Sequence, residues 1–149
     1  MALVLYRLDK YDEALEIFQD VLNKRERILG REHPYTLFTR HNMATTLSTL
    51  GKYNEALGIF QDVLNIRERV LGTEHLDTLR TRNNMALVLD KQGKHDEALR
   101  IFQEVLNIQE CVLGTEHLDT LRTRNNMALV LDKQGKHDEA LGIFQEVLN

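Results

Sequence analysis

The sequence is poor in the residues that interrupt helices and in those that cross-link small folds. Its 149 residues include one proline, eight glycines, one cysteine and no tryptophan. An all-β fold needs glycine or proline turns every few residues, so this scarcity argues against one and favours an all-α fold. A single cysteine forms no internal disulfide and no Asn-x-Ser/Thr acceptor occurs, so we expect an intracellular, reduced chain in the cytoplasm.

Strong charge asymmetry and long apolar runs are lacking as well. The 19 basic and 23 acidic residues are nearly balanced, so the net charge does not indicate a nucleic-acid-binding chain. An apolar content of 42% is too high for a disordered chain. No apolar run approaches the ~18–20 residues of a membrane span, so no membrane partner is expected. The apolar residues 2–5 do not indicate a secretion signal, because Met-Ala-Leu-Val-Leu recurs at 85–89 and 127–131.

The sequence repeats itself with a period of 42 residues. Residues 43–84 match residues 85–126 at 31 of 42 positions, and the last 23 residues differ from residues 85–107 only where Gly142 replaces Arg100. The chain therefore consists of units 1–42, 43–84 and 85–126 and a partial unit 127–149. We predict a single repeat array, cut from a longer one because it starts and stops inside predicted helices.

Each unit predicts two helices joined by a glycine. Apolar residues spaced close to 3.6 predict helix A from about Leu76 to Gln92, ending before Gly93. A second helix, helix B, is predicted from His95 to Leu113 with Gly114 after it, and it has apolar residues on two faces. One pair cannot bury so much apolar surface, so we expect successive antiparallel pairs to stack into an α-solenoid. Phe18, Phe60, Phe102 and Phe144 recur at one position and are predicted to be buried equivalents.

The order Ala86, Leu89, Gly93, Ala98 and Phe102 resembles that of a tetratricopeptide repeat. The 42-residue period and the Asn-Asn-Met-Ala segments at 83–86 and 125–128 are similar to the repeats of kinesin light chains. The resemblance implies a right-handed superhelix with helices A on the concave side, and binding of peptides, acidic ones in kinesin light chains. The family proline survives only as Pro34, and the aromatic residue after the glycine joint becomes histidine in the later units.

Neither a metal site nor a catalytic site is indicated. His33, His75 and His117 are one position copied three times, without the His or Cys cluster of a zinc site, so a histidine near a helix start is the better interpretation. A repeat spreads like groups along an axis, whereas catalysis needs unlike groups at one point. Cys111 stands where other units have arginine and is expected to be partly exposed. We predict no enzyme and no cofactor.

Helix A has a polar stripe on a different face from its apolar residues. If Leu79, Ala86 and Leu89 pack inward, the spacing i, i+3/4, i+7 and i+11 places Arg80, Asn83 or Asn84, Leu87 and Lys91 on a different face. The predicted partner-binding residues are Arg80, Asn83, Asn84, Leu87 and Lys91, their copies Arg122, Asn125, Asn126, Leu129 and Lys133, and His41 and Asn42 in the first unit. Asparagine both donates and accepts hydrogen bonds, so such residues can bind the backbone of an extended peptide. The alternative is a solvated or inter-helix polar layer.

We expect a non-enzymatic scaffold that binds an extended, acidic peptide on the concave helix-A face. Arg80, Arg82, Arg122 and Arg124 make helix A locally basic, and nucleic acid is disfavoured because no aromatic residue repeats along the stripe. Two alternatives stay open. Molecules could stack end to end through their uncapped terminal faces, or the array could be the sensor or scaffold part of a larger signalling protein.

Overall fold

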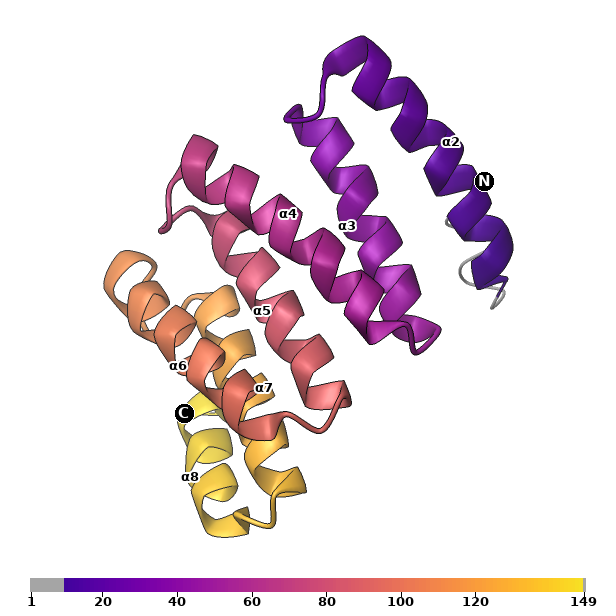
Figure 1. The fold of residues 1–149 in the computed structure, drawn as a ribbon. Helices are drawn as coiled ribbons and strands as arrows, with labels where there is room; N and C mark the ends of the chain where they lie inside the picture. Colours follow the sequence, from indigo (N-terminus) through magenta and orange to yellow (C-terminus); the bar gives the residue numbers. More distant parts are fainter. Residues whose placement is uncertain (1–9, 149) are drawn as a thin grey trace. The chain divides into compact units, whose positions relative to one another are not determined.

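A computed structural model describes residues 10–148, which are helical throughout apart from short connections. The helices are α2 (Tyr11–Leu29), α3 (Pro34–Thr49), α4 (Tyr53–Leu71), α5 (Leu76–Lys91), α6 (His95–Val112), α7 (Leu118–Lys133) and α8 (His137–Leu148). Consecutive helices form hairpins such as α2–α3, α5–α6 and α7–α8 (Figure 1). The all-α prediction is confirmed, and the predicted bounds of the third unit are correct within one residue. The predicted helical segment at residues 1–9 lies outside the described residues.

Glycines end the helices where the repeat predicts it. Gly93, between α5 and α6, has a φ of 84°, a conformation that residues with a Cβ rarely adopt. The same positive φ recurs at the other joints, at Gly30, Gly51, Gly72, Gly114 and Gly135. The two remaining glycines, Gly58 and Gly142, lie inside helices of the B type.

Histidines begin the helices of the A type. His33, His75 and His117 are N-cap residues with extended backbone. In each case Nδ1 accepts a hydrogen bond of 3.1 Å from the backbone N–H two residues later, which satisfies one of the unpaired donors of the first turn. The interpretation of these histidines as residues of helix starts is confirmed.

The chain divides into two compact units, Met1–Ile66 and Arg67–Asn149, which are described separately. In the first, Phe18 and Leu22 of α2 pack with Met43 of α3, and Leu37 of α3 packs with Val63 of α4. In the second, the fully buried residues include Leu79 and Ala86 on α5 and Ala98, Phe102 and Val105 on α6. Burial of these small and large apolar side chains holds each helix pair together.

The four equivalent phenylalanines are not equally buried. Phe18, Phe60 and Phe102 are buried, as predicted. The prediction is wrong for Phe144, which is only partly buried against Ala128, Leu131 and Ala140. Ala128 and Leu131 lie on α7 and Ala140 on α8, so this phenylalanine packs within the last described helix pair. The buried residues of the cluster that it packs against all belong to this one pair.

A partly buried arginine connects a B-type helix to the A-type helix that follows it. Arg67 Nη1 donates to Thr81 Oγ1 at 2.8 Å and to the Asp77 carbonyl at 3.4 Å. Burial lowers the pKa of the Arg67 guanidinium, and the negative charge of Asp77 opposes that shift. In the first unit, Arg25 makes the same contacts with Thr39 and the Tyr35 carbonyl, at 2.7 and 2.9 Å. The contact is thus a repeated feature of the fold.

Among the described residues, no helix combines the length and the apolar character needed to cross a bilayer.

Candidate functional site

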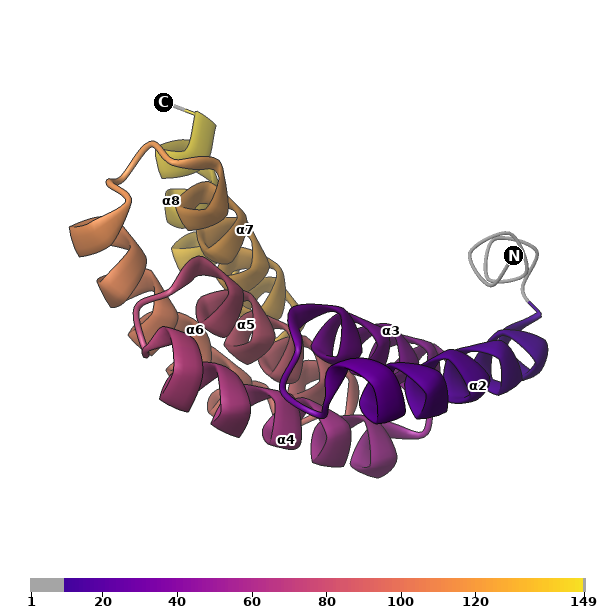
Figure 2. The same ribbon diagram turned by 90° about the horizontal axis from the view of Figure 1, so that it is seen from above.

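Helices α5 and α7 carry ten of the twelve predicted binding residues, and both lie in the second unit. The two helices are side by side (Figure 2) and are joined by the hydrogen bond from Asn83 Nδ2 to Thr123 Oγ1, 2.9 Å long. Each residue advances 100° around a helix, so adjacent residues in the sequence cannot share one face. The structure accordingly divides the predicted residues between two faces.

The first face is directed to solvent and repeats from α5 to α7. We call it the polar stripe. Its arginines and lysines are exposed, Leu129 is exposed, and Asn84, Asn126 and Leu87 are half-buried. The polar stripe comprises Arg80, Asn84, Leu87 and Lys91 on α5 and Arg122, Asn126, Leu129 and Lys133 on α7. The prediction of this stripe assumed that Leu79, Ala86 and Leu89 pack inward. That assumption is confirmed, because all three are buried.

The second face lies between successive repeats. Asn83 is only 9% exposed, and its amide reaches the next A-type helix through Thr123. Asn83 therefore forms part of an inter-helix polar layer, which was the alternative interpretation of the asparagines. Its copy Asn125 is half-buried. Of the paired asparagines, Asn84 and Asn126 belong to the polar stripe and Asn83 and Asn125 do not.

The positive charge of the polar stripe is partly neutralised by acidic residues. Asp119, a buried side chain, lies 3.3 Å from Arg80 and 3.6 Å from Arg122. Arg80 also lies 3.8 Å from Asp77, and Lys133 Nζ donates to Asp90 at 2.6 Å. Three of the four cations of the polar stripe thus lie near three carboxylates, and the fourth, Lys91, leaves a small positive surplus.

Two arginines that contribute to the predicted basic character of helix A form ion pairs with glutamates of the B-type helices. Arg82 pairs with Glu104 of α6. Arg124 pairs with Glu110 of α6 at 2.8 Å and with Glu146 of α8 at 2.6 Å. Both arginines are directed to B-type helices, so counting them in the charge of the stripe was wrong. A tally of charges along a helix does not show which face each side chain occupies.

The two binding residues predicted in the first unit, His41 and Asn42, lie on α3 and are both half-buried. The ring of His41 meets the ring of Phe60 on α4 edge to face, with centroids 5.4 Å apart. His41 occupies the repeat position of Asn83, so an aromatic contact takes the place of an asparagine there.

Sequence reasoning missed a buried aspartate at the end of α5. Asp90 Oδ1 lies 2.6 Å from Nδ1 of His95, while Asp90 Oδ2 accepts from Lys133. In the next repeat Asp132 lies 2.6 Å from His137. The recurring spacing of five residues between aspartate and histidine was the signal that could have revealed this pair.

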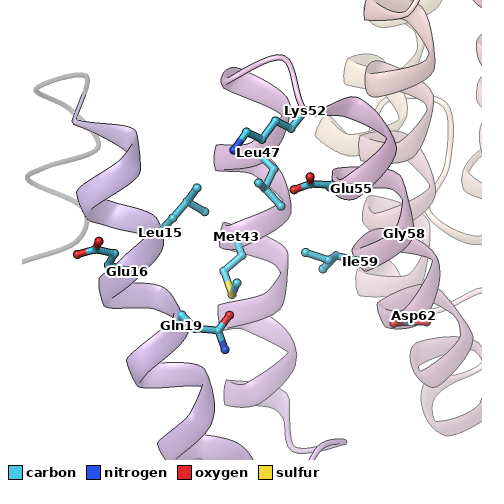
Figure 3. Close-up of a pocket in the computed structure, with 10 residues that line it drawn as sticks. All are labelled: Leu15, Glu16, Gln19, Met43, Leu47, Lys52, Glu55, Gly58, Ile59 and Asp62. Carbon is cyan, nitrogen blue, oxygen red and sulfur yellow. The ribbon is translucent and has the colours of Figure 1, made fainter.

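A second feature that the sequence did not predict is a pocket of about 810 Å³ in the first unit (Figure 3). Its floor is apolar and comprises Leu15 of α2, Met43 and Leu47 of α3 and Ile59 of α4, with charged side chains around them. The remaining lining residues are Glu16, Gln19, Lys52, Glu55, Gly58 and Asp62. Gly58 lies inside α4 at the position where the next repeat has Arg100. This loss of a long side chain was the sequence signal that could have indicated the pocket.

Residues that could support chemistry are scattered. Among the described residues, no three His, Cys, Asp or Glu side chains come together in a way that could hold a metal ion. Cys111, predicted to be partly exposed, is exposed.

Solved structures with this fold come from several proteins. One is a Podosopora anserina protein assigned as a kinesin light chain, whose TPR-like repeats are nearly identical to one another. Its sequence is 25% identical to this chain, with a TM-score of 0.82, and the match covers 98% of this chain and 69% of that one. BtubC from P. vanneervenii is 19% identical over 98% of this chain and 58% of its own, with a TM-score of 0.83.

A third similar structure is that of Bacillus thuringiensis PlcR in complex with the peptide PapR7 and DNA. It is 16% identical, with a TM-score of 0.78, and the match covers 98% of this chain and 51% of PlcR. These likenesses show a tetratricopeptide-repeat solenoid fold. No curated protein matches the chain.

The tetratricopeptide repeat family matches residues 1–69, 49–110 and 77–149, which together cover the whole sequence. The period, the paired helices and the glycine joints agree with this match. The chain belongs to the tetratricopeptide repeat family.

Proposed function

We propose that the polar stripe binds an extended peptide, which lies across α5 and α7 and makes hydrogen bonds through its backbone. The observation that carries the proposal is the repetition of one set of side chains on two adjacent helices. Asn84 and Asn126 occupy equivalent places, and each amide can both donate to and accept from a peptide unit. A peptide backbone offers such groups at regular intervals, so a repeated asparagine suits it without regard to side-chain sequence.

The contacts between α5 and α7 support a preformed site. Asn83 with Thr123, Arg80 with Asp119 and Lys133 with Asp90 hold the two helices in one register. A site that is already ordered loses less conformational entropy on binding than one that has to form.

The family and the fold are consistent with a peptide-binding scaffold. Tetratricopeptide repeats generally serve as non-catalytic interaction scaffolds, and the fold of PlcR, which was crystallised with a peptide, is similar. At 16% identity that likeness extends to the fold alone, so the proposal depends on the stripe.

We further propose a modest preference for acidic peptides. Lys91 and Arg122 are exposed, but three carboxylates offset most of the charge of the stripe. The preference should therefore weaken with added salt, since exposed charges are screened over about 8–10 Å at physiological ionic strength.

The test is a peptide array that spans net charges from acidic to basic, probed with the whole chain and with Asn84→Ala/Asn126→Ala. Loss of one or two hydrogen bonds to the backbone should weaken binding of the captured peptides about tenfold. The matched control is Asn107→Ala, which removes an exposed amide from α6 and should leave binding unchanged. Equal binding by all three proteins would refute the stripe as the peptide site.

A further inference from the structure

The pocket in the first unit has an apolar floor that is continuous with the core. Met43 and Leu47 of α3 are buried at its base, and Leu15 of α2 and Ile59 of α4 point toward them from either side (Figure 3). Leu15 and Ile59 also pack against the buried cluster that contains Phe18 and Met43. Close packing beneath the floor therefore fixes its shape before any ligand binds.

Gly58 keeps the α4 wall of the pocket open. It lies inside a helix, where glycine is less favourable than alanine. A Cβ at this position would meet no atom within 4 Å, so no packing contact requires glycine here. The copy of Gly58 in the next repeat is Arg100. An arginine at residue 58 would place a long, charged side chain in this open space.

The edge of the pocket is acidic. Glu16 of α2 and Glu55 and Asp62 of α4 accompany a single cation, Lys52. The charge of Asp62 is partly offset by two arginines, at 3.7 and 3.9 Å. In the part of the chain that the structure describes, Glu16 and Glu55 have no ion pair. An apolar floor bordered by such carboxylates is complementary to a ligand that carries both apolar and cationic groups.

The same positions two periods later keep the apolar floor but not the acidic edge. The floor residues recur unchanged as Leu99, Met127, Leu131 and Ile143. At the edge, Arg100 takes the place of Glu16, while the other charged positions keep their sign. The lining residues of the pocket therefore carry a net charge of −2, and their copies carry none. The acidic excess is specific to the pocket in the first unit.

We propose that this pocket binds a peptide segment of a partner protein in which apolar residues are flanked by lysine or arginine. The apolar side chains lie over Met43 and Leu47, where they are removed from water. The flanking cations have long, flexible stems that reach Glu16 on α2 and Glu55 on α4. A volume of about 810 Å³ is within the range of ligand-binding pockets.

This site is separate from the polar stripe and has the opposite charge preference. All of the residues that line it belong to α2, α3, α4 and the connection before α4 in the first unit, whereas the polar stripe lies on α5 and α7 in the second. The inference therefore goes beyond the function proposed above, and neither proposal depends on the other.

Isothermal titration calorimetry of the whole chain with three end-blocked synthetic peptides tests the proposed ligand. Lys-Leu-Lys-Leu-Lys should bind about tenfold more tightly than Glu-Leu-Glu-Leu-Glu, which brings carboxylates beside those of the pocket. It should exceed Lys-Ser-Lys-Ser-Lys by a similar factor, because serine has no large apolar side chain to bury. Added salt should weaken its binding, since the cations pair with exposed carboxylates.

Repeat copies supply matched controls for the site. Gly58→Arg obstructs the pocket and adds a positive charge, and Glu55→Arg reverses a charge at its edge. Each should weaken binding of Lys-Leu-Lys-Leu-Lys by about tenfold or more. The controls Gly142→Arg and Glu139→Arg make the same changes at the equivalent positions of α8 and should leave the affinity unchanged. Arg100 shows that this helix position accepts arginine, and circular dichroism checks that each variant is folded.

Several results would overturn the proposal. One is the absence of any heat of binding for Lys-Leu-Lys-Leu-Lys at about 1 mM, a concentration at which even a weak site is occupied. Equal affinity for the acidic peptide would remove the role of the carboxylates, and equal losses at residues 58 and 142 would place the site elsewhere. Asn84→Ala/Asn126→Ala should bind this peptide unchanged. A loss in that variant would assign the peptide to the polar stripe, so the two proposals can fail independently.

Discussion

The substitution Gln109→Arg should stabilise the protein, because it restores a contact that the other repeats make. Gln109 occupies the position of Arg25 and Arg67, each of which binds the threonine of the next A-type helix. Gln109 is fully buried, and neither atom of its amide group has a hydrogen-bond partner among the described residues. An arginine at this position would lie near Thr123 and could bind its Oγ1.

Two favourable contributions and one opposing contribution set the size of the gain. A hydrogen bond from a charged donor contributes about 1.5–3 kcal/mol, and a buried unpaired amide costs about 1–3 kcal/mol. Burial of the guanidinium opposes both, as the lowered pKa of Arg67 indicates. We therefore expect a net gain of about 1 kcal/mol in the free energy of unfolding, which corresponds to about 2–4 °C in Tm for a chain of this size.

Urea unfolding followed by circular dichroism measures this gain as a higher midpoint at an unchanged slope. The matched control is Arg67→Gln, which removes the contact with Thr81 and should lower the midpoint by a similar amount. The reasoning is refuted if Gln109→Arg leaves the midpoint unchanged or lowers it while Arg67→Gln is destabilising. That result would mean that Gln109 is as well satisfied by its surroundings in the third repeat as the arginines are in the other repeats.

Two further comparisons use repeat copies as controls. Phe102→Ala should cost about 3–5 kcal/mol because the ring is fully buried, whereas Phe144→Ala should cost clearly less; equal losses in thermal unfolding would contradict the difference in burial. Gly58→Ala should raise the free energy of unfolding by about 0.5–1 kcal/mol, because alanine favours a helix more than glycine does and the new Cβ meets open space. Gly93→Ala should lower the free energy of unfolding because Gly93 has a positive φ. If both alanine variants were more stable than the unmodified chain, the positive φ of Gly93 would not control the effect.

Helix bounds were predictable because the repeat presents the same signals several times. Gly93 and Gly135 mark one joint, and Gly72 and Gly114 mark the other. Each glycine lies where periodic apolar spacing stops, so composition, period and turn chemistry agree. Local agreement of this kind specifies secondary structure without knowledge of the tertiary contacts.

Burial of the repeated positions was only partly predictable. Phe102 and Phe144 have the same neighbours in sequence, and their apolar periodicity is identical. Burial depends on how much apolar surface from other helices covers a side chain, and periodicity within one helix carries no information about that. The prediction therefore succeeded where a further helix pair follows and failed at the last described one.

The candidate site shows the same limit at the scale of single residues. Sequence spacing admitted either Asn83 or Asn84 to the stripe of helix A, and 100° of rotation separates the two. Only Asn84 lies on the polar stripe, while Asn83 contacts the next repeat. The interpretation of such a pair requires the direction of the adjacent helix, which comes from packing between repeats.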